Sequence, residues 1–312
     1  SSITFTDAAA AYIASKEVEW TNAKHGDQWR NTLAKYVEPL IGSVFVRELD
    51  QSHIVRVLEP IWNTKTETAT RVRGRIEKIL DWAKVAGYRS GENPARWQGH
   101  LSALLPSPSK FQKVEHHAAL PFVEIGAFMV KLRQQEGMGA RALEFAILTA
   151  ARSGEVRGAT WAEVDLKAAT WTIPAERMKI KTNGDHRVPL NAEAIALLKA
   201  MPENGELVFP NTKGTMLSDM TLTAVLRRMN RGDITAHGFR STFRDWVSER
   251  TNYPRDVAEM ALAHGIEDQT EAAYRRGDLF QKRILMMRDW GKFSSRVHTD
   301  ANVTPIKAKA IA

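Results

Sequence analysis

The 312-residue sequence predicts a mainly α protein with a small β-sheet, divided into two domains. Helical periodicity runs from residue 4 to about residue 87 without a convincing alternating strand. Between residues 91 and 118 the periodicity is lost, and three prolines appear with several serines and glycines, as in a linker between domains. Beyond this linker, strand-like alternation flanks one strong turn signal at residues 183–184. The second domain is therefore expected to be mixed α/β.

The first domain is predicted to be a module of four helices. The first starts at Thr6 or Asp7, and the second covers DQWRNTLAKYVEPLIG with Gly42 after its end. The third begins near Gln51 and takes in HIVRVLEPIW, and the fourth spans about 66–86 with an apolar stripe at helical spacing. The fourth helix also carries basic residues that could form either a solvated face or a phosphate-binding face, namely Arg71, Arg73, Arg75 and Lys78.

The second domain is expected to open at Pro121. Helices follow over FVEIGAFMVKLRQQ and ARALEFAILTAA, and the second is apolar enough to be a buried central helix. ATWTIP and HRVPL predict the two strands of a hairpin, and ELVF is a candidate short strand. Ser218 is the expected cap of a helix over DMTLTAVLRRMN. Helices are predicted from residue 236 to residue 290, and a polar, aperiodic tail follows.

Composition favours a polyanionic partner such as nucleic acid, because the formal net charge is +8 and the isoelectric point is about 9.6. The absence of cysteine excludes disulfides and thiolate zinc sites. His116 and His117 are adjacent and cannot share a helix face, so no metal site is expected. No apolar run approaches the roughly 18 residues of a membrane span, and no signal peptide is evident, which favours a cytoplasmic location.

Three stretches of the second domain carry side chains suited to phosphodiester chemistry: AARSGEVRGATW, AHGFRSTFRDW and ALAHGIEDQTEAAYRR. Singly, each candidate also has a structural explanation, as an arginine paired with a nearby glutamate, a capping or core histidine, or an amphipathic core tyrosine. Together they form the set required to bind a phosphodiester and attack it without a metal. The candidates are Arg152, Glu155, His237, Arg240, His264 and Tyr274.

Each residue type suits one part of that chemistry. Guanidinium groups fork onto two phosphate oxygens, so Arg152 and Arg240 could hold the non-bridging oxygens of a transition state that gains charge. Histidines can donate to the phosphate or accept a phenol proton near neutral pH. A tyrosine has an ordinary pKa of about 10 and therefore needs cations and a proton acceptor nearby before Tyr274 can act as a nucleophile. Glu155 could orient Arg152 from behind.

The departing 5′ oxygen requires an acid, and the predicted hairpin RMKIKTNGDHRVPL offers two lysines. Lys179 and Lys181 are two residues apart and so share one face of a strand, near a tip that could reach DNA. Hairpin lysines also serve simply to keep a strand edge soluble. Their catalytic interpretation therefore depends on the rest of the set.

ARSGE, RMK…HRVPL, HGFR and LAH…AAYRR, in this order, resemble the tyrosine recombinase (phage integrase) family. HHAALP, LTAARSGE, HGFRSTFRDW and EAAYRR resemble its P4-type branch of prophages and genomic islands. The resemblance covers the whole second domain. It implies a core-DNA-binding, SAM-like helical domain at 1–100, a linker at 101–119, a catalytic domain at 120–290 and a flexible tail at 291–312. Members of this branch usually also have an arm-binding domain ahead of the helical module.

The resemblance also implies a role for each candidate: Tyr274 as nucleophile, Arg152 and Arg240 as phosphate clamp, His237 and His264 as assisting residues, Glu155 as buttress, and a hairpin lysine as general acid. The stretch from RMK to HRVPL is about two residues longer than the family pattern. The local RMK context favours Lys179, whereas counting back from Pro189 favours Lys181. Both remain candidates.

The implied function is site-specific DNA recombination through a 3′-phosphotyrosyl intermediate, with no metal, ATP or other cofactor. The implied partners are double-stranded DNA attachment sites, accessory DNA-bending and directionality proteins, and three further copies in a homotetrameric synapse, with the free protein compatible with a monomer. No membrane association is expected, and the protein would act in the cytoplasm on the nucleoid. Four apolar residues of LFQKRILMMRDW are candidates to pack on a neighbouring copy or on their own domain, namely Leu279, Ile284, Met287 and Trp290.

Two other functions fit parts of the pattern. A type IB topoisomerase uses related tyrosine chemistry to relax supercoils as a monomer. A non-catalytic DNA-binding or architectural protein could retain the fold without the reaction. Recombined product, relaxation without site preference, and binding without a covalent adduct distinguish the three.

Overall fold

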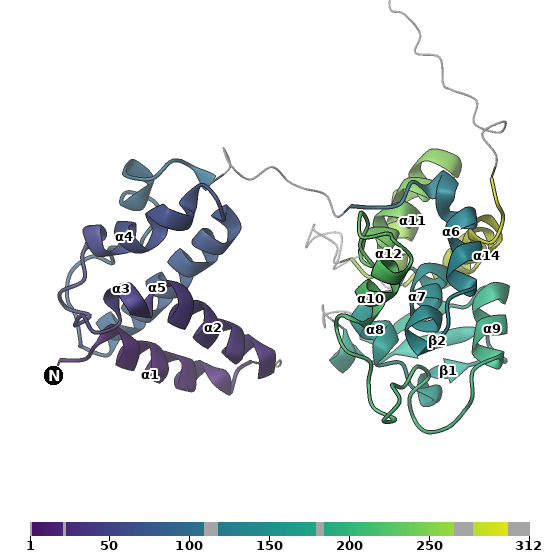
Figure 1. Ribbon diagram of the computed structural model, residues 1–312, viewed down its shortest axis with the longest axis horizontal. Coiled ribbons are helices and arrows are strands. Elements are labelled where there is room, and N and C mark those ends of the chain that lie inside the picture. The colour runs from purple at the N-terminus through teal and green to yellow at the C-terminus, as the bar shows by residue number, and fades with distance from the viewer. Residues whose placement is uncertain (1, 21–22, 109–117, 179–183, 265–276, 299–312) are drawn as a thin grey trace, which may run out of the picture. The chain divides into compact units, whose positions relative to one another are not determined.

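The computed structural model describes residues 2–20, 23–108, 118–178, 184–264 and 277–298 (Figure 1). The chain forms two compact units, residues 1–115 and 116–312. Each unit has its own hydrophobic core. Among the described residues, no helix is long and apolar enough to cross a membrane.

The first unit is helical, with α5 at its centre. Helix α5 packs against α1, α2 and α4, and its apolar stripe is buried as the sequence predicts. Its elements are α1 (Phe5–Glu17), α2 (Ala23–Tyr36), α3 (Glu38–Ile41), α4 (Gln51–Trp62), α5 (Thr66–Val85) and the 3-10 helix η1 (Leu101–Ala103). The four predicted helices are thus present. The end of the second one forms a separate single turn, α3.

Three of the predicted helix boundaries in this unit are wrong. Helix α1 begins at Phe5, one or two residues ahead of the predicted start, because the Thr4 hydroxyl accepts a hydrogen bond from the Asp7 amide (3.3 Å) and caps the helix there. The second predicted helix begins at Ala23, four residues before Asp27, and is divided at Val37 into α2 and α3. Pro39 explains the division, since a proline has no amide hydrogen to donate and is tolerated only in the first turn of a new helix.

The non-helical stretch after α5 packs on the first unit. Ala95, Leu101 and Leu105 are buried in its core. The indole of Trp62 donates to the carbonyl of Pro106 (2.8 Å), which holds the end of this stretch against α4. Loss of helical periodicity here therefore marks irregular structure that still contributes apolar side chains to a core.

The second unit surrounds one buried helix, α7, which contacts α6, α8, α9, α10 and α14 (Figure 1). Every residue from Gly139 to Thr149 except Arg141 is buried, which confirms the predicted central helix. The helices are α6 (Ile125–Arg133), α7 (Met138–Thr149), α8 (Ser153–Arg157), α9 (Ala192–Lys199), α10 (Thr221–Arg228), α11 (Gly238–Arg250), α12 (Arg255–Ala261) and α14 (Phe280–Ser294), with 3-10 turns η3 (Phe122–Glu124), η4 (Trp161–Glu163) and η5 (Ala175–Arg177).

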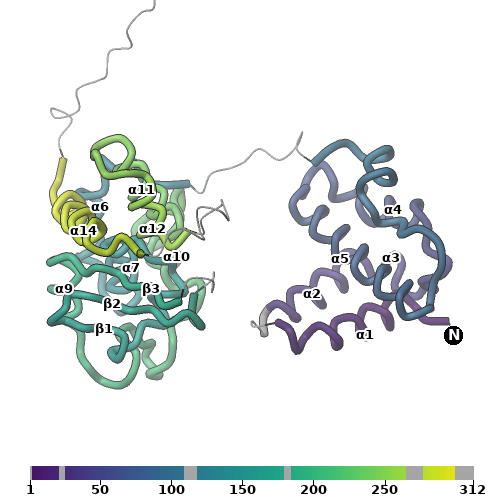
Figure 2. The backbone as a smooth tube through the Cα atoms, turned by 180° about the vertical axis from the view of Figure 1, so that it is seen from behind, coloured from purple at the N-terminus to yellow at the C-terminus, as the bar shows by residue number. Residues whose placement is uncertain are grey.

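A small antiparallel sheet of order β1-β2-β3 lies beside α7 and α9 (Figure 2). It consists of β1 (Val164–Asp165), β2 (Thr170–Ile173) and β3 (His186–Pro189). Strands β2 and β3 pair with Trp171 opposite Val188, which confirms the predicted hairpin. Strand β1 was not predicted, because two residues are too few to show alternation. The segment ELVF does not form a strand, since its Leu207 makes only an isolated bridge to Thr160.

Two further helix boundaries differ from the sequence predictions. Ser218 does not cap a helix, because residues 218–220 form a turn in which the Ser218 carbonyl accepts from the Thr221 amide (3.1 Å), and α10 starts at Thr221. Helix α14 continues past residue 290 to Ser294. Gly291 allows this, since a Cβ there would lie 2.7 Å from Cγ of the buried Asn191, whose side chain is held by the carbonyls of Leu148 and Met287.

The apolar face of α14 packs mainly on its own unit. Met287 and Trp290 are fully buried, and the Trp290 indole donates to the carbonyl of Ile147 on α7 (2.8 Å). Ile284, by contrast, is 37% exposed. The segment thus serves the core of its own domain, with one residue of the predicted set left at the surface.

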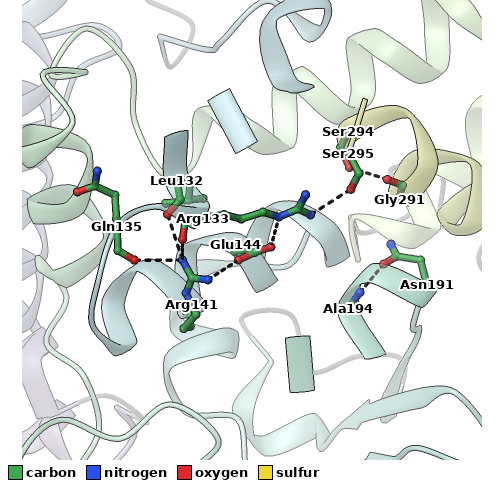
Figure 3. A network of polar contacts seen from close by, with 10 residues as sticks. All are labelled: Leu132, Arg133, Gln135, Arg141, Glu144, Asn191, Ala194, Gly291, Ser294 and Ser295. Carbon is green, nitrogen blue, oxygen red and sulfur yellow. Dashed lines mark hydrogen bonds and ion pairs between the residues drawn. The ribbon is translucent and has the colours of Figure 1, made fainter. Parts of the chain in front are cut away.

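A buried carboxylate ties α7 to its neighbours (Figure 3). Glu144, 4% exposed, lies 2.7 Å from Nε of Arg133 and 3.2 Å from Nη1 of Arg141. Arg133 also donates to the Ser295 hydroxyl at the end of α14 (3.1 Å). Charge-assisted hydrogen bonds therefore join α6, α7 and α14. These bonds restrain α7, whose C-terminal end leads into the candidate site.

We expect Glu144→Ala to lower the free energy of unfolding of this unit by about 2–3 kcal/mol, because it leaves two partly buried arginines without their anion. The figure lies below that for a fully buried pair because both arginines keep some contact with water. Urea unfolding of the full chain followed by circular dichroism would measure the change. Glu249→Gln, at an exposed position of α11, is the matched control. Equal effects of the two substitutions would contradict the proposed contribution of Glu144.

Candidate active site

Arg152 is placed by the abrupt end of α7. Ala150 adopts a left-handed conformation (φ 53°) that terminates α7, and Arg152 then takes an extended conformation immediately before α8. The Glu155 carboxylate accepts from both the Arg152 amide (2.8 Å) and its Nη1 (2.9 Å). Glu155 is buried, so this ion pair holds the guanidinium at a fixed position and orientation.

Arg240 lies in the first turn of α11 and is 5% exposed. Its Nη1 donates to the carbonyl of Ala150 (2.6 Å), and its Nη2 donates to the carbonyl of Leu262 (2.5 Å). Among the described residues, its buried Nε–H has no acceptor. His237 occupies the N-cap position of the same helix but makes no side-chain cap, so the structure does not support a purely capping role for it.

The C-terminal end of α12 is where these side chains meet. Arg152 Nη2 donates to the carbonyl of Ala263 (2.9 Å), directly after the Leu262 carbonyl that Arg240 uses. The imidazole of His186 on β3 bonds to the backbone of Ala261, one residue earlier. Three consecutive residues at this helix end thus accept hydrogen bonds from β3, α11 and the start of α8.

His264 follows directly and is held in one tautomer. Its Nε2 lies 3.2 Å from Nη2 of Arg240, which can only donate, so Nε2 is the acceptor. Its Nδ1 is 2.5 Å from the Glu259 carboxylate and therefore carries the proton. Burial alone would raise the pKa of Glu259, but hydrogen bonds from His264 and Arg244 hold that pKa below its usual value. Glu259 thus remains an anion that orients the imidazole, a role that sequence reasoning missed.

The two guanidinium groups repel each other across the site. Burial and the positive charge of Arg152 lower the pKa of Arg240 to about 10, although the carboxylates of Glu155 and Glu259 oppose this shift. Arg240 is therefore still a cation at neutral pH. A bound anion between the arginines would relieve their repulsion, so the site is electrostatically suited to a phosphate.

His186 also lies in this electropositive region, although the sequence analysis gave it no role. Burial, followed by the charges of Arg283, Arg152 and Arg240, lowers its pKa to about 4, despite the opposing hydrogen bond to Ala261. The imidazole is therefore neutral at physiological pH and adds no further charge beside the arginines. The sequence signal for His186 was its position in HRVPL. That stretch alone does not show which residues the imidazole faces after folding.

We expect the His186 imidazole to titrate near pH 4, followed as its ring proton resonance by NMR and assigned by its loss in His186→Gln. Because this pKa is depressed from an unfolded value of 6.5, the stabilising contribution is fully present above pH 6.5 and is lost as pH falls toward 4. Acid unfolding should therefore be less steep over this window in His186→Gln. A His186 midpoint near 6.5 would contradict the burial and charge environment described above.

Several predicted residues lie outside the part of the chain that the structure describes, namely Tyr274, Lys179, Lys181, His116 and His117. The described residues on either side of them show where these segments join the site. The stretch with Tyr274 follows His264 and is followed by Gly277, and the stretch with both lysines leads into β3. In the described part of the chain, no group of three or more histidine, aspartate and glutamate side chains could hold a metal ion.

The four basic residues of α5 do not form one free surface. Arg71 and Lys78 are exposed, whereas Arg73 turns inward and donates to a backbone carbonyl (2.8 Å). Arg75 lies over the ring of Trp29, 5.2 Å from its centroid. Arg73 and Arg75 therefore serve the fold of the first unit, and the exposed Arg71 and Lys78 are compatible with either face that the sequence predicted.

A helical unit followed by a mixed α/β unit, with two clustered arginines and neighbouring histidines, fits the recombinase class that the sequence motifs implied. Comparison with known families agrees. Residues 5–100 match the phage integrase central domain, and residues 122–278 match the phage integrase family. The chain belongs to the phage integrase (tyrosine recombinase) family, which confirms the predicted family and fold class.

Individual relatives place the chain among prophage integrases. It is 28% identical over 303 residues to the integrase of Enterobacteria phage P4, covering 88% of this chain and 67% of that protein. It is 29% identical over 296 residues to the prophage integrase IntA of Escherichia coli (strain K12), covering 92% and 69%. The protein is thus a phage or prophage-type integrase, an enzyme of site-specific DNA recombination that cleaves and rejoins DNA.

Solved structures share the fold at low sequence identity. A lambda integrase dimer bound to a COC′ core site has a TM-score of 0.66 and 17% identity, covering 89% of this chain and 78% of that one. A lambda integrase tetramer bound to a Holliday junction has a TM-score of 0.64 and 16% identity, covering 86% and 79%. These relatives were crystallised as a dimer and as a tetramer on DNA.

Proposed function

We propose that this integrase cleaves DNA with Tyr274, through a 3′-phosphotyrosyl intermediate, at a phosphate clamped by Arg152 and Arg240. The observation that carries the proposal is the convergence of both guanidinium groups on the adjacent carbonyls of Leu262 and Ala263. These carbonyls lie on the segment that continues toward Tyr274. Arginines held on one rigid element can meet the non-bridging oxygens of a phosphodiester without reorganising.

The reaction conserves the number of phosphodiester bonds. The Tyr274 oxygen attacks phosphorus and the bond from phosphorus to the 5′ oxygen breaks, while Lys179 or Lys181 donates a proton to that oxygen. A 3′-phosphotyrosyl bond and a free 5′ hydroxyl result. The phenol proton passes to a base at the site, and His237, before the Arg240 turn, is the proposed acceptor. The 5′ hydroxyl of a partner strand then attacks the phosphotyrosyl bond and reverses the step, so no energy-rich cofactor is consumed.

His264 acts through Arg240 in this proposal. Without DNA, its Nε2 accepts a hydrogen bond from Arg240, so Nε2 carries no proton. A phosphate oxygen would compete with Nε2 of His264 for the N–H donors of Arg240. Nε2 could then accept a proton, or a hydrogen bond from a water molecule. The Nε–H of Arg240, which has no acceptor in the described part of the chain, provides a further donor.

On DNA we propose that the first unit grips the core site and that the second unit, through the end of α14 at Ser294, carries the chemistry. Arg71 and Lys78, two of the exposed cations of α5, are the proposed phosphate contacts of the first unit. Four copies would assemble on double-stranded attachment sites in the cytoplasm, with accessory DNA-bending and directionality proteins. The lambda integrase tetramer on a Holliday junction supports that assembly.

We expect Tyr274→Phe to keep its affinity for core-site DNA but to form no covalent complex on a nicked suicide substrate, a loss on the order of 10⁴-fold or more in the cleavage rate. Denaturing gel electrophoresis of the protein–DNA adduct is the measurement. An adduct that survives this change would show that another residue is the nucleophile.

Tyr253→Phe is the matched control. Burial and the hydrogen bond to Asp289 (2.6 Å) raise the pKa of Tyr253 to about 12, which makes its phenolate scarce at neutral pH. This tyrosine is therefore unsuited to nucleophilic attack. The control should retain adduct formation, so that loss in Tyr274→Phe alone identifies the nucleophile.

The general acid can be identified by substituting Lys179 and Lys181 to alanine separately. A 5′-phosphorothiolate leaving group needs no proton, so this substrate should restore cleavage in the variant that lacks the acid. Lys199→Ala, at an exposed position of α9, should cleave both substrates normally. If neither lysine variant is defective on the ordinary substrate, or if neither is rescued, the acid lies elsewhere.

A further inference from the structure

Asp278, the second described residue after the Tyr274 segment, is bound by two arginines from different elements. Arg187 on β3 donates to its carboxylate from Nε (3.0 Å) and Nη2 (2.9 Å) in a forked arrangement. Arg283 on α14 donates to the same carboxylate from Nη2 (2.9 Å). The three residues are called the Asp278 junction below.

Arg283 closes the junction through backbone as well as charge. Its Nε donates to the carbonyl of Asp278 (2.8 Å), and its Nη1 donates to the carbonyl of Arg187 (2.7 Å). All three nitrogens of this guanidinium are therefore used, and its side chain is only 1% exposed. The ring of Phe280 lies beneath the Arg187 guanidinium, 4.2 Å from centroid to Cζ. This bonding fixes the start of α14 to β3 more firmly than a lone surface ion pair would.

Strand β3 connects the Asp278 junction to the arginine clamp, which consists of Arg152 and Arg240. His186, the residue before Arg187, bonds to the backbone of Ala261 and lies within the electrostatic influence of Arg152, Arg240 and Arg283. Strand β3 thus reaches from the carbonyls that hold the clamp to the carboxylate that holds the start of α14. The same strand continues the stretch that carries Lys179 and Lys181.

The spacing along the chain makes Asp278 the shorter of two tethers on Tyr274. Asp278 is four positions after Tyr274, which limits their Cα separation to about 14 Å even in a fully extended chain. His264 is ten positions before Tyr274, which permits about 35 Å. The position of the tyrosine relative to the arginines is therefore restricted mainly from the Asp278 side.

We propose that Asp278, Arg187 and Arg283 are positioning residues that hold Tyr274 within reach of the arginine clamp for in-line attack. This inference rests on the proposed function of Tyr274 and adds to it the ionic junction that controls the attack geometry. Because misplacement of a reacting group by about 1 Å can cost about 100-fold in rate, loss of the junction should slow cleavage without weakening DNA binding.

The test substitutes Asp278→Asn in the full chain. Asparagine preserves the acceptor for the Phe280 amide (3.2 Å in the native chain) and so the start of α14, while it removes the charge that the arginines bind. We expect covalent-complex formation on a nicked suicide substrate to slow by about 10- to 100-fold, with unchanged affinity for intact core-site DNA. The 5′-phosphorothiolate substrate should not restore the rate, because the defect lies in the attack and not in the leaving group.

Two further variants make the result specific. Asp289→Asn removes a carboxylate within α14 that also bonds to side chains, those of Tyr253 and Arg288, and it should leave cleavage unchanged. Arg187→Gln removes the forked, half-exposed partner but leaves Arg283 paired with Asp278, so it should slow cleavage in the same way. The double variant should be no slower than Asp278→Asn alone, because that change already removes the ion pair with Arg187.

An unchanged cleavage rate in Asp278→Asn or Arg187→Gln would overturn the inference, as would rescue by the phosphorothiolate, which would assign the junction to the acid side. An equal loss in Asp289→Asn would show a general effect of disturbing α14. If Asp278→Asn fails to fold, Arg187→Gln decides by the same criteria. Failure of the wild-type chain to form a Tyr274-dependent adduct would instead contradict the proposed function, so the two failures are distinguishable.

Discussion

The carbonyl groups at the C-terminal end of α12 hold the arginine clamp together. A helix end presents carbonyls without intrahelical partners and a partial negative charge, and both features attract cationic donors. Leu262 and Ala263 offer theirs to Arg240 and Arg152, while the backbone of Ala261 bonds to His186. Carbonyls satisfy the N–H groups but carry no full charge. The guanidinium of Arg240 is therefore oriented by groups that do not neutralise it, whereas Arg152 is also paired with the Glu155 carboxylate.

The geometry of this helix end depends on an unusual residue. Ala263 adopts a left-handed conformation (φ 48°), with its amide bonded to Met260 and the His264 amide bonded to Glu259. This is the bonding of a Schellman motif, in which glycine is the usual residue because an alanine there costs about 1–2 kcal/mol. The bond from Arg152 to the Ala263 carbonyl opposes that cost. Site and helix end thus stabilise each other, and the motif directs His264 toward Glu259 and Arg240.

Much of the fold follows from local patterns. The apolar stripes of α5 and α7 have helical spacing, and both helices were predicted with their burial. The β2-β3 hairpin follows from its turn signal and its alternating flanks. The predicted helix boundaries were less accurate where a single residue determines the first residue of a helix, as at Thr4, Pro39 and Ser218. Capping depends on which of several competent side chains has a donor within reach, and this is set by the packing of neighbouring elements.

By itself the sequence determined the family, the two-domain organisation of helical and mixed character, and the residue types of the candidate site, because ordered motifs and periodicity are properties of the chain read locally. Only the tertiary structure decided which side chains bond to one another at the candidate site. Glu259, His186 and Asp278 were not recognised, since each gains its role from residues distant in sequence, as Asp278 does from Arg187. Folding alone sets which donors meet which acceptors, because a hydrogen bond depends on distance and angle and not on separation along the chain.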